Sequence, residues 1–162
     1  MPYLIIKKSS IGKGVFAGKD FEKNEKIFDF QGKLFSHDPM PIYNPKKDRF
    51  IQIGRKLYMG GSGMYDDYIN HSCQPNSGVK INGKKAVLVA IKNVLVGQEI
   101  TFDYSTTMDE NNFEMKCLCN KKNCRKKIKD FKYLPHKLKQ KYVLLEIVPK
   151  YNLKYLNGES HK

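Results

Sequence analysis

Short apolar runs separated by turn-forming residues fill the first two thirds of the chain, and this pattern predicts a fold made mainly of β-strands. The runs are too short for helices, and Gly, Pro, Asn and Asp punctuate them as they do in sheets. We expect strands at Leu4–Ile6, Ile27–Phe30, Phe50–Ile53, Leu57–Met59, Val79–Ile81, Ala86–Ile91 and Glu99–Tyr104. The Asn82-Gly83 pair predicts a tight hairpin, because both residues tolerate the positive φ values that such a turn requires.

Beyond Lys116 the pattern changes from strand-like runs to a helical repeat. Four apolar residues recur at spacings of three or four: Leu134, Leu138, Tyr142 and Leu145. This spacing places them on one face of a helix, with Pro135 in its first turn and Pro149 beyond its end. The chain therefore divides into a β-rich body over 1–115, a cysteine segment over 116–127 and a helical extension over 128–162.

Length and composition limit the class of protein. With 162 residues, of which 40% are hydrophobic, the chain can bury one core but is too short for two full domains. Charged residues interrupt every apolar stretch, so we expect no membrane-spanning helix and no membrane partner. Lys7-Lys8 interrupts the apolar start before a signal peptide can form, which favours a cytoplasmic location. Export to a host cell and action in a nucleus stay open as alternatives.

The formal net charge of +14 arises mostly in one region. Lys116–Lys141 contains 11 basic residues and a single acidic residue, Asp130. Such a density attracts phosphates and acidic surfaces, which indicates a nucleic acid as a partner. The alternative is a solvated face, because only Arg49, Arg55 and Arg125 offer guanidinium groups, which suit bidentate phosphate recognition. Charge alone leaves both interpretations open.

The four cysteines are spaced like metal ligands. Cys117, Cys119 and Cys124 lie within eight residues, and Cys73 stands 44 residues before the first of them. In an extended segment, residues two apart face the same side, so Cys117 and Cys119 can both point at one ion. Zinc prefers four tetrahedral nitrogen or sulfur ligands in a structural site, and Cys73 can supply the fourth. The alternative is four free thiols.

Three further motifs suggest a binding site, although each has an ordinary structural explanation. Gly12–Ala17 contains two glycines that let a backbone approach a ligand closely, or that simply form a loop. Asn70–Asn76 gathers polar side chains that would otherwise satisfy buried backbone groups. Gly97–Tyr104 is a turn followed by a strand whose aromatic residues would ordinarily belong to the core.

Taken together and in this order, four motifs resemble those of the SET-domain protein-lysine methyltransferases. They are Gly12–Ala17, Asn70–Asn76, Gly97–Tyr104 and Cys117–Cys124. The resemblance spans Tyr3 to Arg125 and implies a mainly β, β-clip fold of several small sheets with knot-like C-terminal threading. It also implies a zinc-stapled post-SET loop followed by a C-terminal helix. The tail, in which Phe131–Pro135 leads into that helix, resembles the tail of small stand-alone bacterial SET proteins.

The resemblance implies a role for individual residues. S-adenosylmethionine would be held by Gly12, Lys13, Gly14, Asn70, His71 and Leu118. Tyr104 matches the catalytic tyrosine, and Phe102 lines the substrate-lysine channel beside it. One structural zinc ion would be bound by Cys73, Cys117, Cys119 and Cys124. Phenylalanine at position 102 implies di- or trimethylation, since no second hydroxyl anchors the amine.

The substrate implied by the resemblance is a lysine-bearing protein, with a histone or another basic protein among the candidates and a nucleosome as a further contact. A basic substrate would need an acidic groove on an enzyme this basic, and five acidic residues could line one: Asp66, Asp67, Asp109, Glu110 and Glu114. Their alternative role is ordinary solvated loop charge. Asp66–Ile69 replaces the arginine and aromatic residue that many family members carry before the asparagine-histidine pair.

The competing hypothesis is a non-catalytic, zinc-stapled basic binding module on a SET scaffold, associated with nucleic acid. Asn70, His71 and Tyr104 argue against it, because a scaffold without catalysis would not need all three. Neither the oligomeric state nor a specific substrate motif follows from the sequence.

Overall fold

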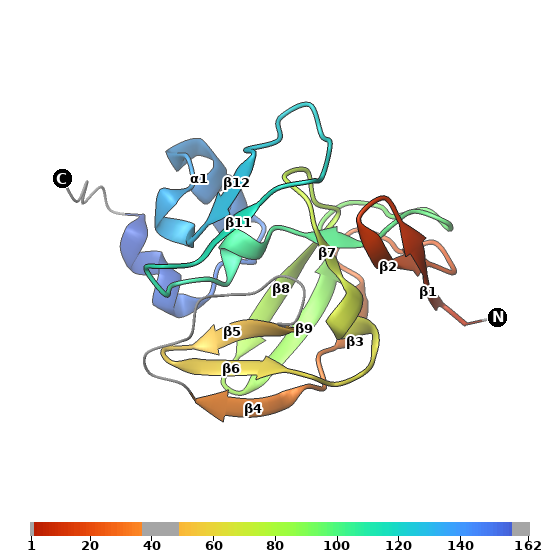
Figure 1. Cartoon of the computed structure of the whole chain (residues 1–162), viewed down its shortest axis with the longest axis horizontal. Coiled ribbons are helices and arrows are strands. Elements are labelled where there is room, and N and C mark those ends of the chain that lie inside the picture. Colours follow the sequence, from red (N-terminus) through yellow and green to blue (C-terminus); the bar gives the residue numbers. More distant parts are fainter. Residues whose placement is uncertain (1, 37–48, 157–162) are drawn as a thin grey trace.

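The computed structural model describes residues 2–36 and 49–156, and it confirms a mainly β chain built from several small sheets (Figure 1). The strands are β1 (Leu4–Ser9), β2 (Gly12–Ala17), β3 (Lys26–Asp29), β4 (Lys33–Ser36), β5 (Phe50–Gly54), β6 (Leu57–Gly60), β7 (Asn70–His71), β8 (Ser77–Asn82), β9 (Lys85–Ala90), β10 (Thr101–Phe102), β11 (Glu114–Lys116) and β12 (Lys127–Lys129). The helices are α1 (His136–Leu144) and the 3-10 helices η1 (Tyr65–Tyr68), η2 (Tyr104–Thr106), η3 (Phe131–Tyr133) and η4 (Lys150–Tyr155).

The described strands form five small sheets of two or three strands each. β1 pairs with β2 and β11 with β12, while two three-stranded sheets have the orders β3-β9-β8 and β4-β6-β5. β7 and β10 form a short parallel pair. Apolar residues from the β1–β2 hairpin and from the two three-stranded sheets meet in one core, in which Val15, Leu88 and Ile100 are fully buried.

The predicted hairpin between β8 and β9 is confirmed, with Asn82 paired to Lys85. Of the two residues expected to take positive φ, only Gly83 does so, at +59°. The central residues of the turn are therefore Gly83 and Lys84, one position later than Asn82-Gly83.

Two segments differ from their sequence-based expectation. The loop interpretation of Gly12–Ala17 is wrong: the segment is β2, because alternate side chains such as Val15 and Ala17 are buried while it pairs with β1. Within the segment Glu99–Tyr104, which was expected to be one strand, the strand β10 covers only Thr101–Phe102, and Glu99 forms an isolated antiparallel bridge with Phe16. β10 ends there because the Asp103 side chain accepts a hydrogen bond from the Ser105 backbone N–H and starts η2.

The parallel β7–β10 pair brings two distant motifs side by side. Asn70 lies opposite Thr101 and His71 opposite Phe102. The Asn76 side chain continues the contact beyond the strands, since it donates to the Glu99 carbonyl at 2.8 Å and accepts from the Thr101 N–H at 2.9 Å. This pairing puts the start of η2 next to β7.

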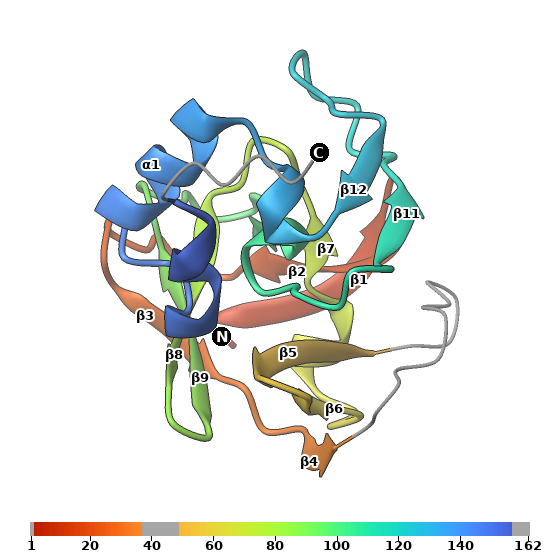
Figure 2. The same cartoon turned by 90° about the vertical axis from the view of Figure 1, so that its left-hand side faces the viewer.

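The C-terminal extension packs against the body. The helix predicted between Pro135 and Pro149 exists as α1, but Pro135 is its N-cap rather than part of its first turn, and Leu145 ends it. Beyond α1, Ile147 packs so closely on Gly78 of β8 that a Cβ atom on the glycine would lie 2.5 Å from the Ile147 side chain. Figure 2 shows α1 and the following turns lying over β8 and β9. Among the described residues, no helix has the length and apolar character needed to cross a membrane.

Candidate functional site

A cavity of about 530 Å³ lies where β2, the η1–β7 segment, β10 and the cysteine segment meet. Seven of the residues that the resemblance assigned to the cofactor or the substrate lysine line it: Gly12, Lys13, Asn70, His71, Phe102, Tyr104 and Leu118. The fold therefore brings the glycine motif, the asparagine-histidine motif and the tyrosine motif to one chamber, with the cysteine segment at its edge. Arg49 and Lys116 also line the chamber, and neither stands in a motif that would have indicated it.

Gly14 does not line the cavity but supports it from behind. A Cβ atom at this position would lie 2.3 Å from the Glu99 carboxylate oxygen and 2.9 Å from the Asn70 amide nitrogen. The Asn70 amide donates to Glu99 Oε1 at 2.7 Å and to the Lys13 carbonyl at 3.0 Å. Gly14 thus leaves room for Glu99 to hold Asn70. Sequence reasoning did not assign a role to Glu99, although it belongs to the Gly97–Tyr104 motif.

Tyr104 stands at the inner end of the chamber beside two other rings. Its ring centroid lies 4.8 Å from that of Phe102 and 5.4 Å from that of His71. The Tyr104 hydroxyl donates to the Ile69 carbonyl at 2.7 Å. Because that bond uses the phenolic proton, the phenolic oxygen can act as an acceptor toward a donor in the chamber.

His71 is a neutral, buried histidine. Burial lowers its pKa to about 4, with the Arg125 charge acting in the same direction and Asp103 opposing it. Its Nδ1 accepts a hydrogen bond from the Tyr104 backbone N–H at 3.2 Å. A neutral imidazole carries one proton, so Nε2 must hold it and act as a donor. Nε2 lies 3.4 Å from the Cys73 sulfur, which it can reach as a hydrogen-bond donor.

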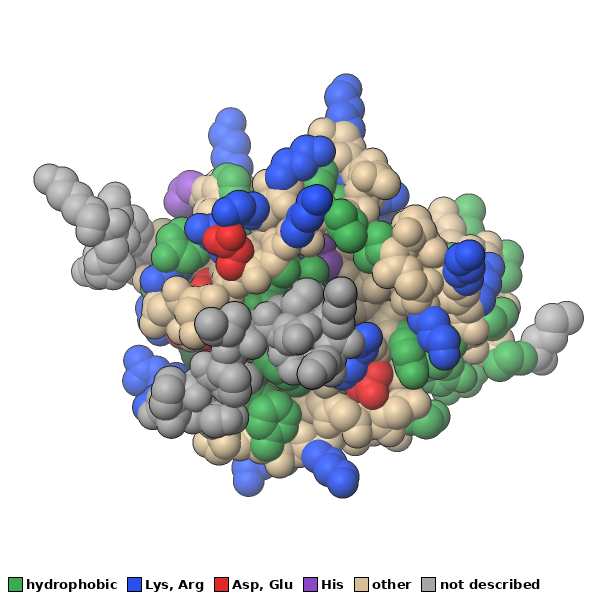
Figure 3. Space-filling view, viewed as in Figure 1, with side chains coloured by type: hydrophobic (Ala, Val, Ile, Leu, Met, Phe, Trp, Pro, Cys, Tyr) green, Lys and Arg blue, Asp and Glu red, His purple; other side chains and the backbone are tan. Residues whose placement is uncertain are grey.

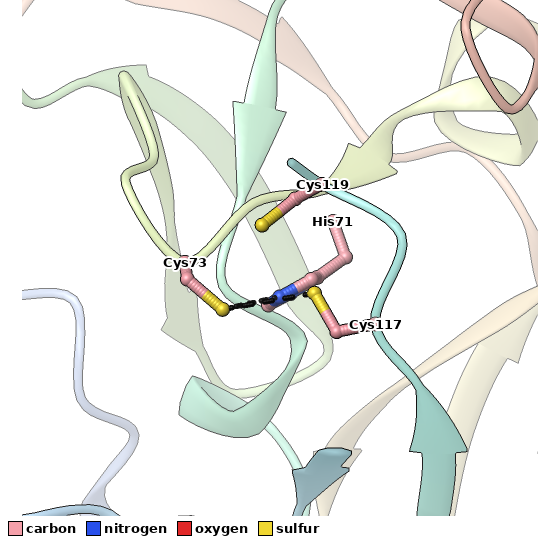
Figure 4. A group of neighbouring side chains, drawn as sticks. All are labelled: His71, Cys73, Cys117 and Cys119. Carbon is pink, nitrogen blue, oxygen red and sulfur yellow. Dashed lines mark hydrogen bonds between the residues drawn. The ribbon is translucent and has the colours of Figure 1, made fainter. Parts of the chain in front are cut away.

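Three cysteines converge on a point near His71 (Figure 4). One ligand atom from each of His71, Cys73, Cys117 and Cys119 lies within 4.8 Å of the others, and the Cys73 and Cys117 sulfurs are 3.7 Å apart. Two sulfurs bound tetrahedrally to one zinc ion lie about 3.8 Å apart, given zinc–sulfur bonds of about 2.3 Å. The separation therefore fits a shared zinc ion.

Cys124 does not belong to this group of four ligand atoms, but its thiol suits a zinc ion better than His71 does. The Cys124 side chain lies within hydrogen-bonding reach of Cys117 and Cys119. His71 Nε2 carries a proton while Nδ1 accepts from Tyr104, so neither nitrogen of this ring offers a lone pair to a metal. Donor chemistry thus favours the four thiols over a set that includes His71.

The environment of the thiols suits a cation. Burial raises the pKa of Cys73 to about 11 and raises that of Cys117 further, so both would be protonated without a nearby positive charge. Burial opposes ionisation of Cys119 too, but hydrogen bonds from the backbone and from neighbouring thiols lower its pKa to about 7. Backbone N–H groups already point at two sulfurs, from Arg125 to Cys73 at 3.3 Å and from Lys126 to Cys124 at 3.5 Å.

The acidic residues considered for a substrate groove do not gather in one place. Asp66 and Asp67 line the cavity, but they accept hydrogen bonds from backbone groups of Gln31, Ser62 and Gly63 and so shape the loop before η1. The other three lie elsewhere: Asp109 pairs with Lys154, Glu114 pairs with Lys127 and Lys129, and the Glu110 N–H donates to Asp130. Within residues 2–36 and 49–156, Asp66 and Asp67 are therefore the only acidic residues that line the chamber.

Comparison with known proteins gives one family match and many relatives. The SET domain model matches residues 12–105. The variant-silencing SET domain-containing protein of Plasmodium falciparum is 32% identical over 137 residues, and the alignment covers 74% of this chain and 5% of that protein. Histone-lysine N-methyltransferase 2D of Homo sapiens is 26% identical over 133 residues, which cover 71% of this chain and 2% of that protein. An H3 lysine-36 specific histone-lysine N-methyltransferase of Candida glabrata is 31% identical, with coverage of 74% and 18%.

Solved structures give the same fold. The crystal structure of KRYPTONITE in complex with mCHG DNA and SAH matches with a TM-score of 0.63 at 23% identity, covering 78% of this chain and 29% of that one. A second KRYPTONITE structure, with mCHH DNA, an H3(1-15) peptide and SAH, matches with a TM-score of 0.63 and 22% identity. The chain thus spans less than a third of the length of each of these proteins.

Proposed function

Because the chain belongs to the SET-domain family, we propose that it is an S-adenosylmethionine-dependent protein-lysine methyltransferase. The observation that carries the proposal is the chamber itself, in which Asn70 and His71 face Phe102 and Tyr104 with Leu118 at the edge. Two of the relatives compared are named histone-lysine N-methyltransferases, and the neighbouring structures hold SAH, the demethylated form of the methyl donor. These names support a lysine acceptor and S-adenosylmethionine as donor.

The residues of the chamber suit attack by an amine on a sulfonium methyl group. A lysine ammonium has an ordinary pKa of about 10.4 and must lose a proton before it can attack. Burial beside the rings of Phe102 and Tyr104 disfavours its charged form, so no dedicated base is required. The Tyr104 oxygen, held by the Ile69 carbonyl, accepts from the neutral amine and orients its lone pair. An ordinary phenol with a pKa of about 10 is a poor base, so its contribution is orientation.

Zinc would serve the site as a staple rather than as a catalyst. Four thiolate ligands from Cys73, Cys117, Cys119 and Cys124 close the coordination sphere and leave no open position for substrate. Cys73 belongs to the body and the other three to the cysteine segment, so the ion would tie the two together. Leu118 stands between two of the ligands and would thereby be kept at the edge of the cavity.

A methyl-transfer assay tests the proposal directly. Purified protein is incubated with radiolabelled S-adenosylmethionine and with histone octamers, nucleosomes or a cell lysate, and modified lysines are identified by mass spectrometry. We expect transfer to lysine side chains of at least one protein. A thermal shift with duplex DNA but none with S-adenosylmethionine, together with no transfer to any protein, would instead support the non-catalytic binding module.

Phe102 sets the expected number of methyl groups. Its ring is 3% exposed and brings no hydroxyl to the amine, so a partly methylated lysine can rotate for another transfer. We expect di- or trimethyllysine from the natural protein, and monomethyllysine as the main product of Phe102→Tyr, whose added hydroxyl would hold the amine. The product distribution is read by mass spectrometry at equal substrate conversion. An unchanged distribution would remove Phe102 from this role.

The loop of the cysteine segment is suited to a nucleic-acid contact near the site. Lys121, Lys122 and Lys126 are exposed there, and none forms an ion pair within the described ranges. Figure 3 shows lysines standing out on this face, where acidic side chains are few. We include DNA, as part of a nucleosome, among the proposed partners.

Neutralising the loop should weaken that contact in a salt-dependent way. For the triple change of Lys121, Lys122 and Lys126 to Gln, we expect the slope of log affinity against log salt to fall by about 3, at about 0.9 per lost phosphate contact. Fluorescence anisotropy with duplex DNA measures it. Lys84→Gln with Lys85→Gln, at the exposed β8–β9 turn, is the control. A salt-independent interaction would contradict the proposed contact.

A further inference from the structure

A buried carboxylate beside the catalytic tyrosine joins three separate parts of the chain. Asp103 is 1% exposed and lies between Phe102 and Tyr104. Its two oxygens accept a bidentate pair of hydrogen bonds from the Arg125 guanidinium, at 2.6 and 2.7 Å. One oxygen also accepts from the Tyr142 hydroxyl at 2.8 Å, and the other accepts from the Ser105 N–H at 3.1 Å.

Two partners of Asp103 come from the cysteine segment and from the C-terminal extension. Arg125 directly follows Cys124, and its own backbone N–H donates to the Cys73 sulfur at 3.3 Å. Tyr142 belongs to α1 of the C-terminal extension and is 1% exposed. The carboxylate therefore connects the cysteine cluster and the extension with the turn that carries Tyr104.

Each partner is needed to hold this carboxylate in place. An ionised group taken out of water must have its oxygens satisfied by donors, and the bidentate Arg pair gives the most directional contact available. The Tyr142 hydroxyl keeps its proton and so remains a donor, since burial and the neighbouring Asp103 raise its pKa far above the ordinary value. Loss of either donor would leave a lone pair of Asp103 without a partner, so the side chain would reorient.

Reorientation of Asp103 would directly affect the position of Tyr104. Its side chain caps η2, whose first residue is Tyr104, and the Tyr104 N–H in turn donates to His71. We propose that Tyr142 and Arg125 are positioning residues, which hold Asp103 and thereby fix the direction of Tyr104 for methyl transfer. The inference rests on the proposed function. It means that the C-terminal extension contributes, through Tyr142, to the geometry of the site.

Tyr142→Phe tests the proposal with the smallest change. The ring stays in the core while the hydroxyl is removed. We expect kcat to fall by about 10- to 100-fold, the size of effect produced by small misplacements of reacting groups, with the KM for S-adenosylmethionine within about twofold. Arg125→Lys keeps the charge but not the two parallel bonds, and it should lower kcat in the same way with its zinc content unchanged.

The matched control is Tyr155→Phe. Tyr155 also belongs to the extension and also donates to a carboxylate, Asp109, at 2.5 Å, but that carboxylate does not adjoin Tyr104. We expect its kcat to remain within about twofold of the natural protein. An equal loss of kcat in Tyr142→Phe and Tyr155→Phe would show a general effect of the extension and would overturn the proposal.

A second measurement does not depend on activity. Amide hydrogen exchange at Ser105 and Thr106 reports on η2, since their N–H groups bond to the side chain and the carbonyl of Asp103. We expect exchange to be about tenfold faster in Tyr142→Phe and unchanged in Tyr155→Phe. Natural protection in Tyr142→Phe would overturn the proposal even if the methyltransferase function held. Absence of methyl transfer by the natural protein, with exchange as expected, would instead count against the proposed function alone.

Discussion

Tyr104→Phe is expected to lower kcat for lysine methylation by about 100-fold or more while leaving the affinity for S-adenosylmethionine nearly unchanged. The change removes the oxygen that accepts from the amine and keeps the ring between Phe102 and His71. It also removes the hydrogen bond from the Tyr104 hydroxyl to the Ile69 carbonyl, and this bond fixes the direction of the phenolic oxygen. Single-turnover kinetics and calorimetric titration with S-adenosylmethionine separate the two effects.

A tyrosine outside the cavity provides the control. Tyr65 belongs to η1 and packs on Phe28, with ring centroids 6.4 Å apart, so Tyr65→Phe should keep normal kinetics. Near-normal turnover by Tyr104→Phe would exclude the assigned orienting role. Loss of cofactor binding in that variant would point instead to a structural role for the hydroxyl.

Removal of zinc is expected to abolish cofactor retention and methyl transfer together. Once the ion is gone, the cysteine segment is held by the short β11–β12 pair and by the contacts of Arg125 with Asp103 and Cys73, whereas zinc binding to comparable thiolate sites contributes about 10–16 kcal/mol. Leu118 would then leave the edge of the cavity. Treatment with a strong chelator should therefore lower the thermal midpoint and turnover in parallel, as followed by metal analysis, differential scanning calorimetry and the methyl-transfer assay.

Two variants distinguish the ligand sets. If the ligands are the four thiols, Cys124→Ser should reduce zinc well below one equivalent, while His71→Gln should retain it. The opposite result would make His71 the fourth ligand. In that case His71 Nδ1 would have to carry the proton, and the hydrogen bond that it now accepts from the Tyr104 N–H would be lost. Metal content per folded protein decides between the two sets.

Much of the fold was predictable because its information is local. Seven strand-like runs and the β8–β9 hairpin are visible in stretches of a few residues, and so is the repeat that forms α1. Gly12–Ala17 was misassigned because glycines argue against a strand, whereas burial of Val15 and Ala17 outweighs that preference. The end of β10 was misplaced because Asp103 caps a helical turn, an effect that hydrophobic pattern does not contain.

The site, too, has parts that the sequence predicts and parts that it does not. The cysteines and the motifs around Asn70 and Tyr104 stand out in the sequence, and the structure gathers them around one cavity. The residues that hold these motif residues in place do not stand out in the sequence. Glu99 acts on Asn70 from 29 residues away, and Tyr142 reaches Asp103 from 39 residues away. No spacing rule connects such pairs, because only the three-dimensional path of the chain sets their distance.

The reach of Tyr142 back to Asp103 has a consequence for how the protein is made. A ribosome releases the chain from the N-terminal end, so the β-rich body emerges well before α1 does. Until residue 142 has cleared the exit tunnel, the carboxylate of Asp103 lacks one of its donors and the turn that carries Tyr104 is incompletely held. Nascent chains that stop before α1 should therefore collapse into a sheet-containing but inactive intermediate, and activity should appear only after α1 has emerged.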